Sequence, residues 1–491
     1  MSVIEISNLT FAYEGSYDAI FENVSLRLDT DWRLGLVGRN GRGKTTLLRL
    51  LQGALPCGGA VRSTVPCDYF PFPIPDPCKD AIGVVEDVQP DYEYWRLARE
   101  LYRLALSDEI LYRPFRSLSG GEQMRLLLAL LFARENRFLL IDEPTNHLDT
   151  EARALVADYL KSKRGFLLVS HDRAFLDGCV DHILSINKSD ISLQKGNFSS
   201  WFSNKEQIDA FELAENERLR ADIRRLDEAA KRAARWSDRT ESEKHARNSG
   251  LRPDRGYIGH KAAKMMQRAK SLEARRLDAV EQKAGLLHNV ERVDDLKLHP
   301  LSYRAQALAE LTDVAVQYGG APVVADVRLA VTRGARIALT GRNGSGKSSL
   351  LKLIAGQDIP HTGTVRLGSG LTVSYVPQDA SFLSGSLTGY ADACSVDRTL
   401  FLSILRKLDF ARVQFEKDMA DYSAGQKKKV LLARSLCEQA HLYLWDEPLN
   451  YIDVFSRMQI EQLLLAYQPT LLFVEHDRAF CEKIATETVR L

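Results

Sequence analysis

The sequence has few cysteines and no long hydrophobic run, and each absence excludes a class of protein. Seven cysteines are scattered over 491 residues, and no two of them form a Cys-x-x-Cys pair. This pattern indicates neither a zinc site nor a disulfide framework, so we expect reduced thiols and a cytoplasmic location. The longest apolar run, residues 126–133, is far shorter than the roughly 18 residues that a membrane-spanning helix needs. A membrane partner is therefore not expected. A secretory signal is not expected either, because residues 1–5 carry no basic segment followed by an apolar stretch.

A large excess of either charge is also absent, since the formal net charge is +1. The average hides a segregated distribution. Residues 218–276 hold 18 Lys and Arg against 8 Asp and Glu, a local charge of +10, which leaves −9 for the remainder of the chain. A basic segment on a mildly acidic body indicates a localised surface for a polyanionic partner such as nucleic acid.

The sequence does contain one set of motifs twice. Gly38–Thr45, with the pattern Gly-x-x-x-x-Gly-Lys-Thr, recurs 303 residues later as Gly341–Ser348. Two further motifs recur in the same order at offsets of 304 and 305, namely Asp142-Glu143-Pro144 at 446–448 and His171–Phe175 at 476–480. Several elements in one order at a nearly constant offset predict two copies of one nucleotide-handling domain.

The apolar pattern predicts an α/β fold for each copy. Continuous apolar runs such as 138–141 and 166–170 are typical of parallel strands covered on both faces, and helical patterns alternate with them. We expect the first copy to occupy residues 1–202 and the second to occupy residues 301–491, with an interdomain linker over residues 203–300.

The linker carries a helical pattern of its own. Apolar residues are spaced four and three apart from Leu219 to Ala233 and again from Ile258 to Leu272. Residues 237–256 between them are rich in Ser, Asn, Gly and charge, so an antiparallel hairpin of two helices with a loop tip is predicted. Helices of about 33 to 36 residues would extend roughly 50 Å. A charged linker without fixed structure is the alternative.

Each glycine-rich motif follows an apolar strand and opens a helical pattern, which is the context that a phosphate-binding loop requires. Backbone N–H groups would surround the phosphates of ATP, Lys44 and Lys347 would reach the β and γ oxygens, and the hydroxyls of Thr45 and Ser348 would bind Mg²⁺. The candidate ATP-binding residues are Gly38, Asn40, Gly41, Gly43, Lys44, Thr45 and Thr46 in the first loop, and Gly341, Asn343, Gly344, Gly346, Lys347, Ser348 and Ser349 in the second.

A pair of acidic residues ends one apolar strand in each copy. Asp142 and Asp446 stand where a carboxylate can hold the magnesium shell. Glu143 and Glu447 follow directly and are candidates for the general base that polarises the attacking water. A helix N-cap or a solvated acid is the plainer interpretation, and the surrounding motifs count against it.

A third motif completes the pattern of a known family. Leu118-Ser119-Gly120-Gly121-Glu122-Gln123 precedes a helical stretch and recurs as Tyr-Ser-Ala-Gly-Gln at 422–426. A Ser-Gly-Gly turn at a helix N-terminus is an anion site made of N–H groups and a hydroxyl. With the phosphate loops, the Asp-Glu-Pro motifs and one His after a strand, this order resembles the ABC-type ATPases. The resemblance covers both copies, about 390 of 491 residues.

The resemblance implies that the two domains close head to tail over two ATP molecules, as an intramolecular pair within a monomer. One composite site would contain Lys44, Asp142, Glu143, His171, Ser423 and Gly425. The other would contain Lys347, Asp446, Glu447, His476, Ser119 and Gly121. By the same resemblance, His171 and His476 would contact the γ-phosphate as catalytic residues. Tyr13 and Tyr318 match the adenine-stacking aromatic, although core packing is an alternative for both, and Gln378 matches the glutamine that completes the magnesium shell.

Two departures from the family pattern fall on the composite site of Lys44. The stretch 69–72, Tyr-Phe-Pro-Phe, lacks the glutamine that the second copy has as Gln378. The second signature carries Ala424 where glycine is usual. We therefore predict that the two sites hydrolyse ATP at different rates, with the Lys44 site the slower.

Two such domains joined by a charged helical hairpin resemble the ABC-F family, which acts on ribosomes. The ATPase subunit of a membrane drug exporter is the alternative from a different class. The resemblance implies that the protein binds the E site of the 70S ribosome and that its linker contacts large-subunit rRNA and the P-site tRNA through shape and charge. The RNA-contact candidates are Arg224, Arg225, Lys231, Arg232, Arg235, Trp236, Lys244, Arg247, Arg252, Arg255, Tyr257, Lys261, Lys264 and Arg268.

Within ABC-F, three stretches resemble the antibiotic-resistance branch of Lsa and Vga type, namely Ile4–Tyr13, Asp254–Met266 and Pro448–Asp453. This resemblance implies ribosome protection, in which the ATP-bound protein displaces the P-site tRNA and antagonises lincosamide, pleuromutilin and streptogramin A antibiotics. A housekeeping ABC-F translation factor that acts on stalled ribosomes is the alternative within the family.

Overall fold

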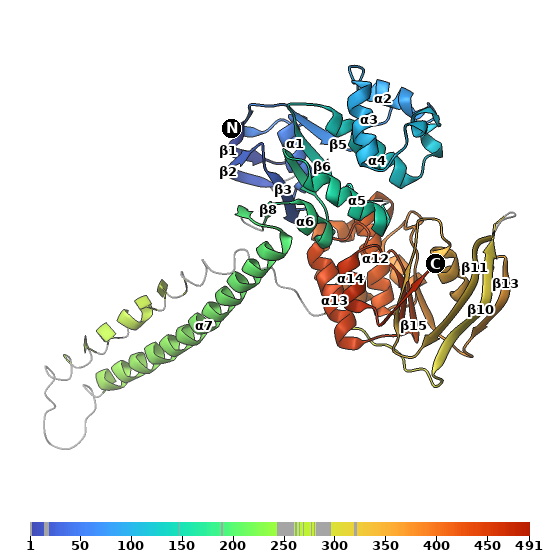
Figure 1. Cartoon of the computed structure of the whole chain (residues 1–491). Helices are drawn as coiled ribbons and strands as arrows, with labels where there is room; N and C mark the ends of the chain where they lie inside the picture. The colour runs from blue at the N-terminus through green and yellow to red at the C-terminus, as the bar shows by residue number, and fades with distance from the viewer. Residues whose placement is uncertain are drawn as a thin grey trace, which may run out of the picture. The chain divides into compact units, whose positions relative to one another are not determined.

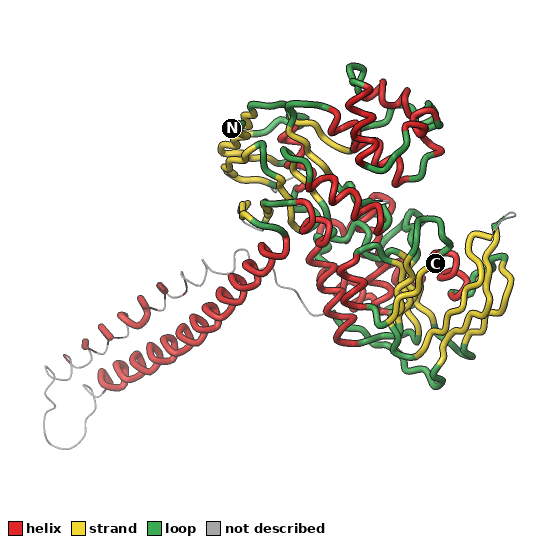
Figure 2. The backbone as a smooth tube through the Cα atoms, in the orientation of Figure 1, coloured by secondary structure: helices red, strands yellow, loops and turns green. Residues whose placement is uncertain are grey.

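The computed structural model describes residues 2–13, 19–146, 148–187, 190–242, 296–318 and 322–491, together with scattered positions between 260 and 280. The chain divides by its internal contacts into two units. One unit contains Met1–Ser199 and Val293–Leu491 and holds both α/β copies, and the other contains Ser200–Arg292. Figure 1 labels the elements and Figure 2 separates helices from strands. The finer division at residues 202/203 and 300/301 stays a prediction.

The first copy is built on two sheets. Three antiparallel strands form the smaller sheet in the order β2 (Phe21–Asp29), β1 (Val3–Phe11), β4 (Gly58–Ser63). The larger sheet has the order β5 (Cys67–Phe70), β6 (Phe138–Asp142), β7 (Phe166–Val169), β3 (Arg33–Gly38), β8 (His182–Ile186), β9 (Ile191–Lys195). Its strands are parallel from β5 to β8, and β9 is antiparallel to β8. The continuous apolar runs of β6 and β7 are buried, as expected for strands covered on both faces.

Helices connect the strands of the first copy. They are α1 (Lys44–Gln52), α2 (Ala81–Val88), α3 (Tyr94–Arg103), α4 (Gly120–Ala133), α5 (Thr150–Lys161) and α6 (Arg173–Cys179), with short 3₁₀ turns η1 (Asp108–Tyr112) and η2 (Phe115–Ser117). Side chains cap several of these helices. Ser119 and Glu122 form a capping box at α4, and Asp149 and Asp172 accept backbone N–H bonds at α5 and α6.

The second copy repeats this plan. Its antiparallel sheet has the order β11 (Pro322–Thr332), β10 (Ala307–Gln317), β13 (His361–Leu367). Its parallel sheet has the order β14 (Val373–Val376), β15 (Leu442–Asp446), β16 (Leu471–Val474), β12 (Arg336–Thr340), β17 (Glu487–Arg490). The helices are α9 (Lys347–Ile354), α10 (Leu387–Ala393), α11 (Arg398–Lys407), α12 (Ala424–Cys437), α13 (Val454–Tyr467) and α14 (Arg478–Ile484), and the 3₁₀ turns are η4 (Arg412–Glu416) and η5 (Met419–Asp421). The predicted fold, two tandem α/β nucleotide-binding domains with a linker, is confirmed.

The linker begins with one long helix, α7 (Phe198–Ser242), of 45 residues. It is longer than the expected 33 to 36 residues because it starts at Phe198, before the expected boundary at residue 203, and continues to Ser242, past residue 237 where the loop tip was expected to begin. The prediction of a loop was therefore wrong for residues 237–242, and residues 243–256 of the expected tip lie outside the described part of the chain. Ser199 joins this first turn to the first copy, since its backbone N–H donates to Asp177 at 2.8 Å. Beyond Ser242, helical residues recur at 263–264, 266–268 and 270–275. None of the described helices is long and apolar enough to cross a membrane.

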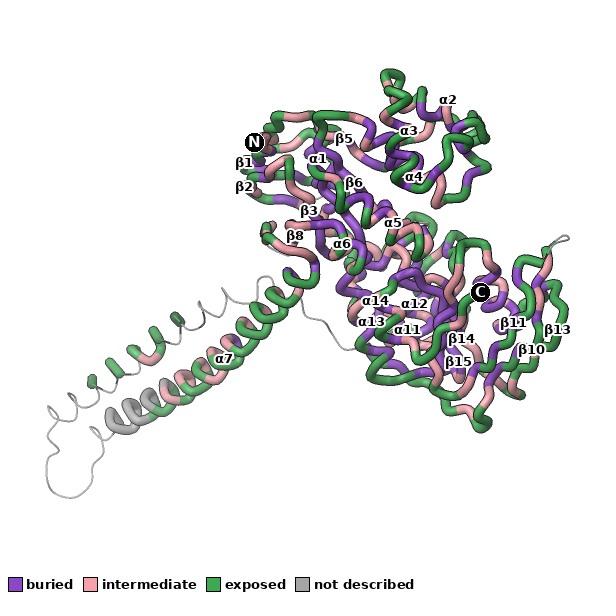
Figure 3. Tube along the Cα trace, in the orientation of Figure 1, coloured by how far each residue is buried: buried purple, intermediate pink, exposed green. Residues whose placement is uncertain are grey.

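Burial separates the two units. Both α/β copies have extensive buried cores, whereas the described part of α7 is mostly exposed (Figure 3). The described RNA-contact candidates Arg224, Arg225, Lys231, Arg232, Arg235, Lys264 and Arg268 are all exposed. Trp236 lies in α7, but its side chain is outside the description, as are the candidates Lys244, Arg247, Arg252, Arg255, Tyr257 and Lys261.

Candidate ATP-binding and hydrolysis sites

The first phosphate loop joins the buried strand β3 to α1. The ammonium group of Lys44 is buried and donates to the carbonyl oxygens of Gly38 at 2.8 Å and Arg39 at 3.2 Å, and to Asn40 Oδ1 at 3.3 Å. Gly43 has a φ of 88°, and a Cβ there would lie 2.5 Å from Ile20. Only glycine fits this position, so the loop keeps its backbone close to the bound phosphates.

The strand next to this loop ends in Asp142. The Thr45 hydroxyl donates to Asp142 Oδ2 at 2.8 Å, and the Tyr69 hydroxyl donates to the same oxygen at 3.0 Å. A hydroxyl and a carboxylate in contact are the hard oxygen donors that Mg²⁺ prefers, so Thr45 and Asp142 fit that ion. The second copy fits it as well, because both carboxylate oxygens of Asp446 are buried and make no hydrogen bond within the described residues. Burial raises the pKa of Asp446 to about 6, and contact with the Ser348 hydroxyl offsets only part of that increase.

Glu143 follows Asp142 and lies against His171. Glu143 Oε1 and His171 Nε2 are 3.2 Å apart, and Glu143 adopts a φ of 52°, which is unusual for a residue with a side chain. In the second copy Glu447 Oε1 and His476 Nε2 are 3.5 Å apart, and Glu447 has a φ of 47°. The same strained backbone in both copies aims each glutamate at its histidine.

The Lys44 site is a cavity of about 770 Å³ lined by both copies. From the first copy it includes Tyr13, Asn40, Gly41, Gly43, Lys44, Thr45, Thr46, Asp142, Glu143 and His171, and from the second it includes Ser423, Ala424, Gly425, Lys429 and Tyr451. Asn40 Nδ2 donates to the carbonyl oxygen of Tyr451 at 2.9 Å. A Cβ on Gly425 would approach that same oxygen to 2.6 Å. The structure thus brings together the two halves that the resemblance implies for this site.

The Lys347 site repeats the arrangement in a cavity of about 430 Å³. Lys347 Nζ donates to the carbonyl oxygens of Gly341 at 2.9 Å and Arg342 at 2.8 Å. The second copy supplies Asn343, Gly344, Gly346, Lys347, Ser348, Ser349, Gln378, Glu447, Asn450 and His476, and the first copy supplies Gly120, Leu148 and Arg153. The expected Ser119 and Gly121 do not line this cavity; Gly120 between them does. Ser119 instead caps α4, accepting from the backbone N–H of Glu122.

The two tyrosines expected at adenine lie beside the loops. Tyr13 is 49% exposed, its hydroxyl lies 3.0 Å from the hydroxyl of Thr46, and its ring packs edge-on against Phe11. Tyr318 is 53% exposed and donates to Ser349 Oγ at 3.1 Å. About half of the surface of each tyrosine thus remains exposed beside the loop, so neither residue is buried in the core.

The electrostatics of the two general-base candidates differ. Burial, and next the charge of Asp142, raises the pKa of Glu143 to about 8. Burial alone would raise the pKa of Glu447, but its hydrogen bond with His476, the charge of His476 and contact with Gln378 together lower it to about 2. Burial also lowers the pKa of His171 well below the ordinary value for histidine. The two carboxylates are thus placed in unlike surroundings.

The missing glutamine of the first copy has a structural counterpart. Phe72, which stands where the second copy has Gln378, lies outside the residues that line the Lys44 cavity. Its ring packs edge-on against Phe70, and the guanidinium of Arg134 lies 5.5 Å from its centroid. Phe72 therefore contributes to packing, and the cavity has no amide oxygen at the place where Gln378 lines the other site.

Several residues at the sites were not predicted. Tyr69 binds Asp142 directly, and Tyr375 is its counterpart at an offset of 306. Asn450 donates to Glu447 Oε2 at 2.5 Å, and Tyr451 reaches the opposite phosphate loop. Tyr69 and Tyr375 recur at a nearly constant offset, so a residue-by-residue comparison of the two copies would have found them.

Comparison with known proteins agrees with this geometry. A family model described as ABC transporter matches residues 21–146 and 324–450. The ATP-binding protein Uup of Caulobacter vibrioides is 31% identical, covering 96% of this chain and 74% of that protein. The ribosome protection protein VmlR of Bacillus subtilis is 28% identical, covering 98% and 85%. The energy-dependent translational throttle protein EttA of Escherichia coli is 25% identical, covering 95% and 88%.

A solved structure shares the fold. The archaeal ribosome recycling factor aABCE1, in complex with the archaeal ribosomal stalk protein aP1, has a TM-score of 0.63 at 20% identity, covering 98% of this chain and 87% of that chain. The matched domains and the two composite sites define an ATPase with tandem ATP-binding cassettes, which binds and hydrolyses ATP. The relatives that match along nearly the whole chain place it further, and the chain belongs to the ABC-F family.

Proposed function

We propose that this ATPase binds the 70S ribosome in its ATP-bound form and protects it from antibiotics. In this proposal the protein works in the cytoplasm as a monomer whose two cassettes pair over ATP. It enters the ribosomal E site, its linker reaches large-subunit rRNA and the P-site tRNA near the peptidyl transferase centre, and lincosamides, pleuromutilins and streptogramin A are displaced. ATP hydrolysis then releases the protein.

The residues of each cassette have distinct roles in this cycle. Lys44 and Lys347 hold the β- and γ-phosphates, and Glu143 and Glu447 take a proton from the attacking water as general bases. His171 and His476, next to these glutamates, orient the γ-phosphate. Mg²⁺, when bound through Thr45 and Asp142 or through Ser348, Gln378 and Asp446, neutralises charge on the phosphates. Ser423 and Gly425 at one site, and Ser119 and Gly121 at the other, close over the nucleotide from the opposite cassette.

The basic linker is the observation that carries the proposal. Four described cations on α7 are more than 60% exposed, namely Arg218, Arg225, Lys231 and Arg232. Acidic neighbours three or four residues away pair with them, and such exposed pairs are weak enough to exchange for RNA phosphates. The local charge of +10 over residues 218–276 gives a net attraction that those pairs do not cancel.

The relatives support this choice of partner and leave a second candidate. VmlR is named a ribosome protection protein, and it matches 98% of this chain. EttA is named a translational throttle protein, which favours a housekeeping role in translation as the second candidate. The two candidates share ribosome binding and differ in whether drug tolerance changes.

Ribosome binding is tested by pelleting. The double variant Glu143→Gln/Glu447→Gln with ATP is expected to sediment with 70S ribosomes. Substitution of Arg224, Arg225, Lys231 and Arg232 by Gln should weaken binding and reduce the log–log salt slope by up to about 3.6, since each phosphate contact contributes roughly 0.7 to 0.9. Gln at Arg328 and Arg366, exposed on the small sheet of the second cassette, is the control and should leave binding unchanged. Sedimentation free of ribosomes at moderate salt would favour the exporter-subunit alternative.

Drug protection is tested separately. Expression of the chain should raise the inhibitory concentration of lincosamides, pleuromutilins and streptogramin A. Shortening residues 240–256 should abolish this effect while ATP hydrolysis continues. A growth or elongation phenotype without drug, with no change in inhibitory concentration, would instead support the housekeeping role.

A further inference from the structure

Both cassettes clamp the loop that follows their catalytic glutamate in one common way. Arg153 Nε donates to the carbonyl oxygen of Leu148 at 3.1 Å, and its Nη1 lies 3.0 Å from Asp172. In the second cassette Arg457 Nε donates to the carbonyl oxygen of Ile452 at 2.9 Å, and its Nη1 lies 3.0 Å from Asp477. The two arginines make the same two contacts through the same atoms. The matching arginines and carbonyl groups are 304 residues apart in the sequence, and the matching aspartates are 305 apart.

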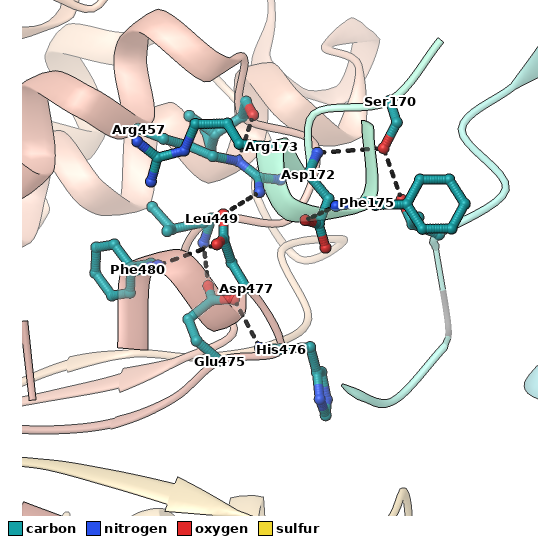
Figure 4. A network of polar contacts seen from close by, with 12 residues as sticks. Ser170, Asp172, Arg173, Phe175, Leu449, Arg457, Glu475, His476, Asp477 and Phe480 are labelled. Carbon is teal, nitrogen blue, oxygen red and sulfur yellow. Dashed lines mark hydrogen bonds and ion pairs between the residues drawn. The ribbon is translucent and has the colours of Figure 1, made fainter. Parts of the chain in front are cut away.

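The cassettes differ at a second clamp on the same loop. In the first cassette the hydroxyls of Thr145 and Ser170 lie 3.3 Å apart, and both residues are buried. At the matching positions the second cassette has Leu449 and Glu475, so the hydroxyl pair is missing. Glu475 Oε1 instead accepts the backbone N–H of Leu449 at 2.7 Å, and Oε2 accepts the N–H of His476 at 3.1 Å (Figure 4). A buried carboxylate thus does in the second cassette what two hydroxyls do in the first.

The loop held by Glu475 serves both ATP sites. Glu447 stands at its start and lines the Lys347 cavity. Tyr451, four residues later, lines the Lys44 cavity and accepts the hydrogen bond from Asn40. Leu449 lies midway between them, so a contact to its backbone N–H acts on the part of the loop that joins the two ends.

Glu475 does not itself face the nucleotide. It is 4% exposed and is absent from the linings of both ATP cavities. It faces a separate cavity of about 350 Å³ behind His476, which also includes Thr150 and Glu482. We propose that Glu475 is a positioning residue for ATP hydrolysis, which fixes Glu447 at one site and Tyr451 at the other through the N–H of Leu449. The inference rests on the role of Glu447 as general base in the proposed function.

A double-mutant cycle tests this role. ATP hydrolysis is measured for Glu475→Ser, Leu449→Thr and the combined variant, in the otherwise unchanged chain and in a Glu143→Gln background that reports the Lys347 site. Glu475→Ser is expected to lower kcat at least about 10-fold with KM for ATP nearly constant, because only transition-state alignment is lost. The combined variant rebuilds the Thr145–Ser170 pair of the first cassette and should recover kcat to within about 3-fold.

A merely structural role would not produce that recovery. An unchanged kcat in Glu475→Ser, or a loss that Leu449→Thr does not repair, overturns the proposal. The isosteric variant Glu475→Gln retains an oxygen that can accept the Leu449 N–H, and it keeps the test valid if the serine variant misfolds. Its kcat should fall less than that of Glu475→Ser. An equal or larger fall in kcat contradicts the mechanism. Glu482→Gln, an exposed acid on the same cavity, is the matched control and should leave kcat unchanged.

The Lys44 site supplies an independent arm. In a Glu447→Gln background, Glu475→Ser should also lower the residual turnover, because Tyr451 belongs to the same loop. Normal turnover there overturns the coupling of the two sites. Should Glu447→Gln alone leave the Lys347 site active, the assignment of the general base fails, and that result is separate from the response to Glu475→Ser.

Discussion

The guanidinium of Arg173, at the start of α6 in the first cassette, forms an ion pair with Glu461 on α13 of the second. Glu461 is fully buried, and its other oxygen accepts a hydrogen bond from Lys483 Nζ at 3.0 Å. The matching arginine of the second cassette does not make the equivalent contact. Arg478, the counterpart of Arg173, pairs with Glu482 within its own helix and is 73% exposed. The two cassettes are therefore fastened by a buried ionic contact on one flank only.

Removal of the charge on Glu461 should destabilise the pairing of the cassettes. Glu461→Gln leaves Arg173 and Lys483 without their anion, and breaking a buried pair typically costs about 3 kcal/mol. Urea unfolding should show a lower midpoint with an unchanged slope. Glu482→Gln breaks the exposed counterpart and should leave the midpoint unchanged. Equal midpoints for Glu461→Gln and the unsubstituted chain would contradict this account.

Turnover should be divided unequally between the two ATP sites. Phe72 packs against Arg134 at the position where the other cassette has Gln378. Ala424 stands where the signature motif usually has glycine. Both departures belong to the Lys44 site, so we expect ATP hydrolysis to be slower there. Glu447→Gln is expected to remove more than half of the total rate, and Glu143→Gln less than half. Steady-state phosphate release decides between this outcome and equal losses, which would show that the sites are equivalent.

Gly425 packs closely against Tyr451 within the second cassette, and this packing requires the absence of a side chain at Gly425. A Cβ there would lie 2.6 Å from the carbonyl oxygen of Tyr451, and backbone leaves no room for adjustment. Gly425→Ala should weaken ATP binding at the Lys44 site by about 10-fold, an amount equivalent to roughly 1.4 kcal/mol. Binding of a fluorescent ATP analogue measures this change. Gly178→Ala is a suitable control, because its Cβ would meet Ala157 at an ordinary 3.5 Å, and unaltered binding in Gly425→Ala would refute the steric argument.

A buried carboxylate in the first cassette should give a pH-dependent contribution to stability. Glu100 is fully buried and accepts hydrogen bonds from Lys163 at 2.5 Å and Tyr159 at 2.7 Å. Burial alone would raise the pKa of Glu100, but these bonds and the charge of Lys163 outweigh it, so its pKa is lowered. The stabilisation is then fully present above the unfolded pKa, near 4.3, and disappears as the pH falls through the lower folded pKa.

The variant Glu100→Gln isolates that contribution. We expect it to lose about 2 kcal/mol at pH 7, because hydrogen bonds to a charged group are among the stronger ones. Denaturant unfolding at pH 7, 5 and 3.5 should show the difference constant between the first two and smaller at the third. A difference that grows toward acid pH would show that the sign assigned to Glu100 is wrong.

Local pattern accounts for the parts of the fold that were predicted. The glycines of the two phosphate loops and the apolar runs of β6 and β7 depend on neighbouring residues only, and these elements formed where expected. The apolar spacing of α7 likewise predicted a helix, although not its two ends. The start of α7 at Phe198 was not predicted, because the bond between Ser199 and Asp177 that secures its first turn joins segments separated by 22 residues.

Contacts between distant segments account for what the sequence did not show. Tyr69 reaches Asp142 because β5 pairs with β6 in a register that sets Tyr69 opposite Leu140. Glu475 was overlooked because its value depends on Leu449, 26 positions earlier, which lacks a hydroxyl. Neither relationship follows from the spacing within a motif, and both become visible once the strands have placed the loops side by side.

The Glu475–Leu449 clamp also has a genetic consequence. In an ATPase assembled from two identical subunits, every substitution appears at both catalytic centres, so a change tolerable in only one of them is eliminated. Here each centre is encoded by its own stretch of a single gene, and a serine–threonine pair could be exchanged for a carboxylate in one half alone. Fusion of the two cassettes in one chain therefore lets the two centres acquire different rates of ATP hydrolysis, although both centres form when the same two cassettes pair.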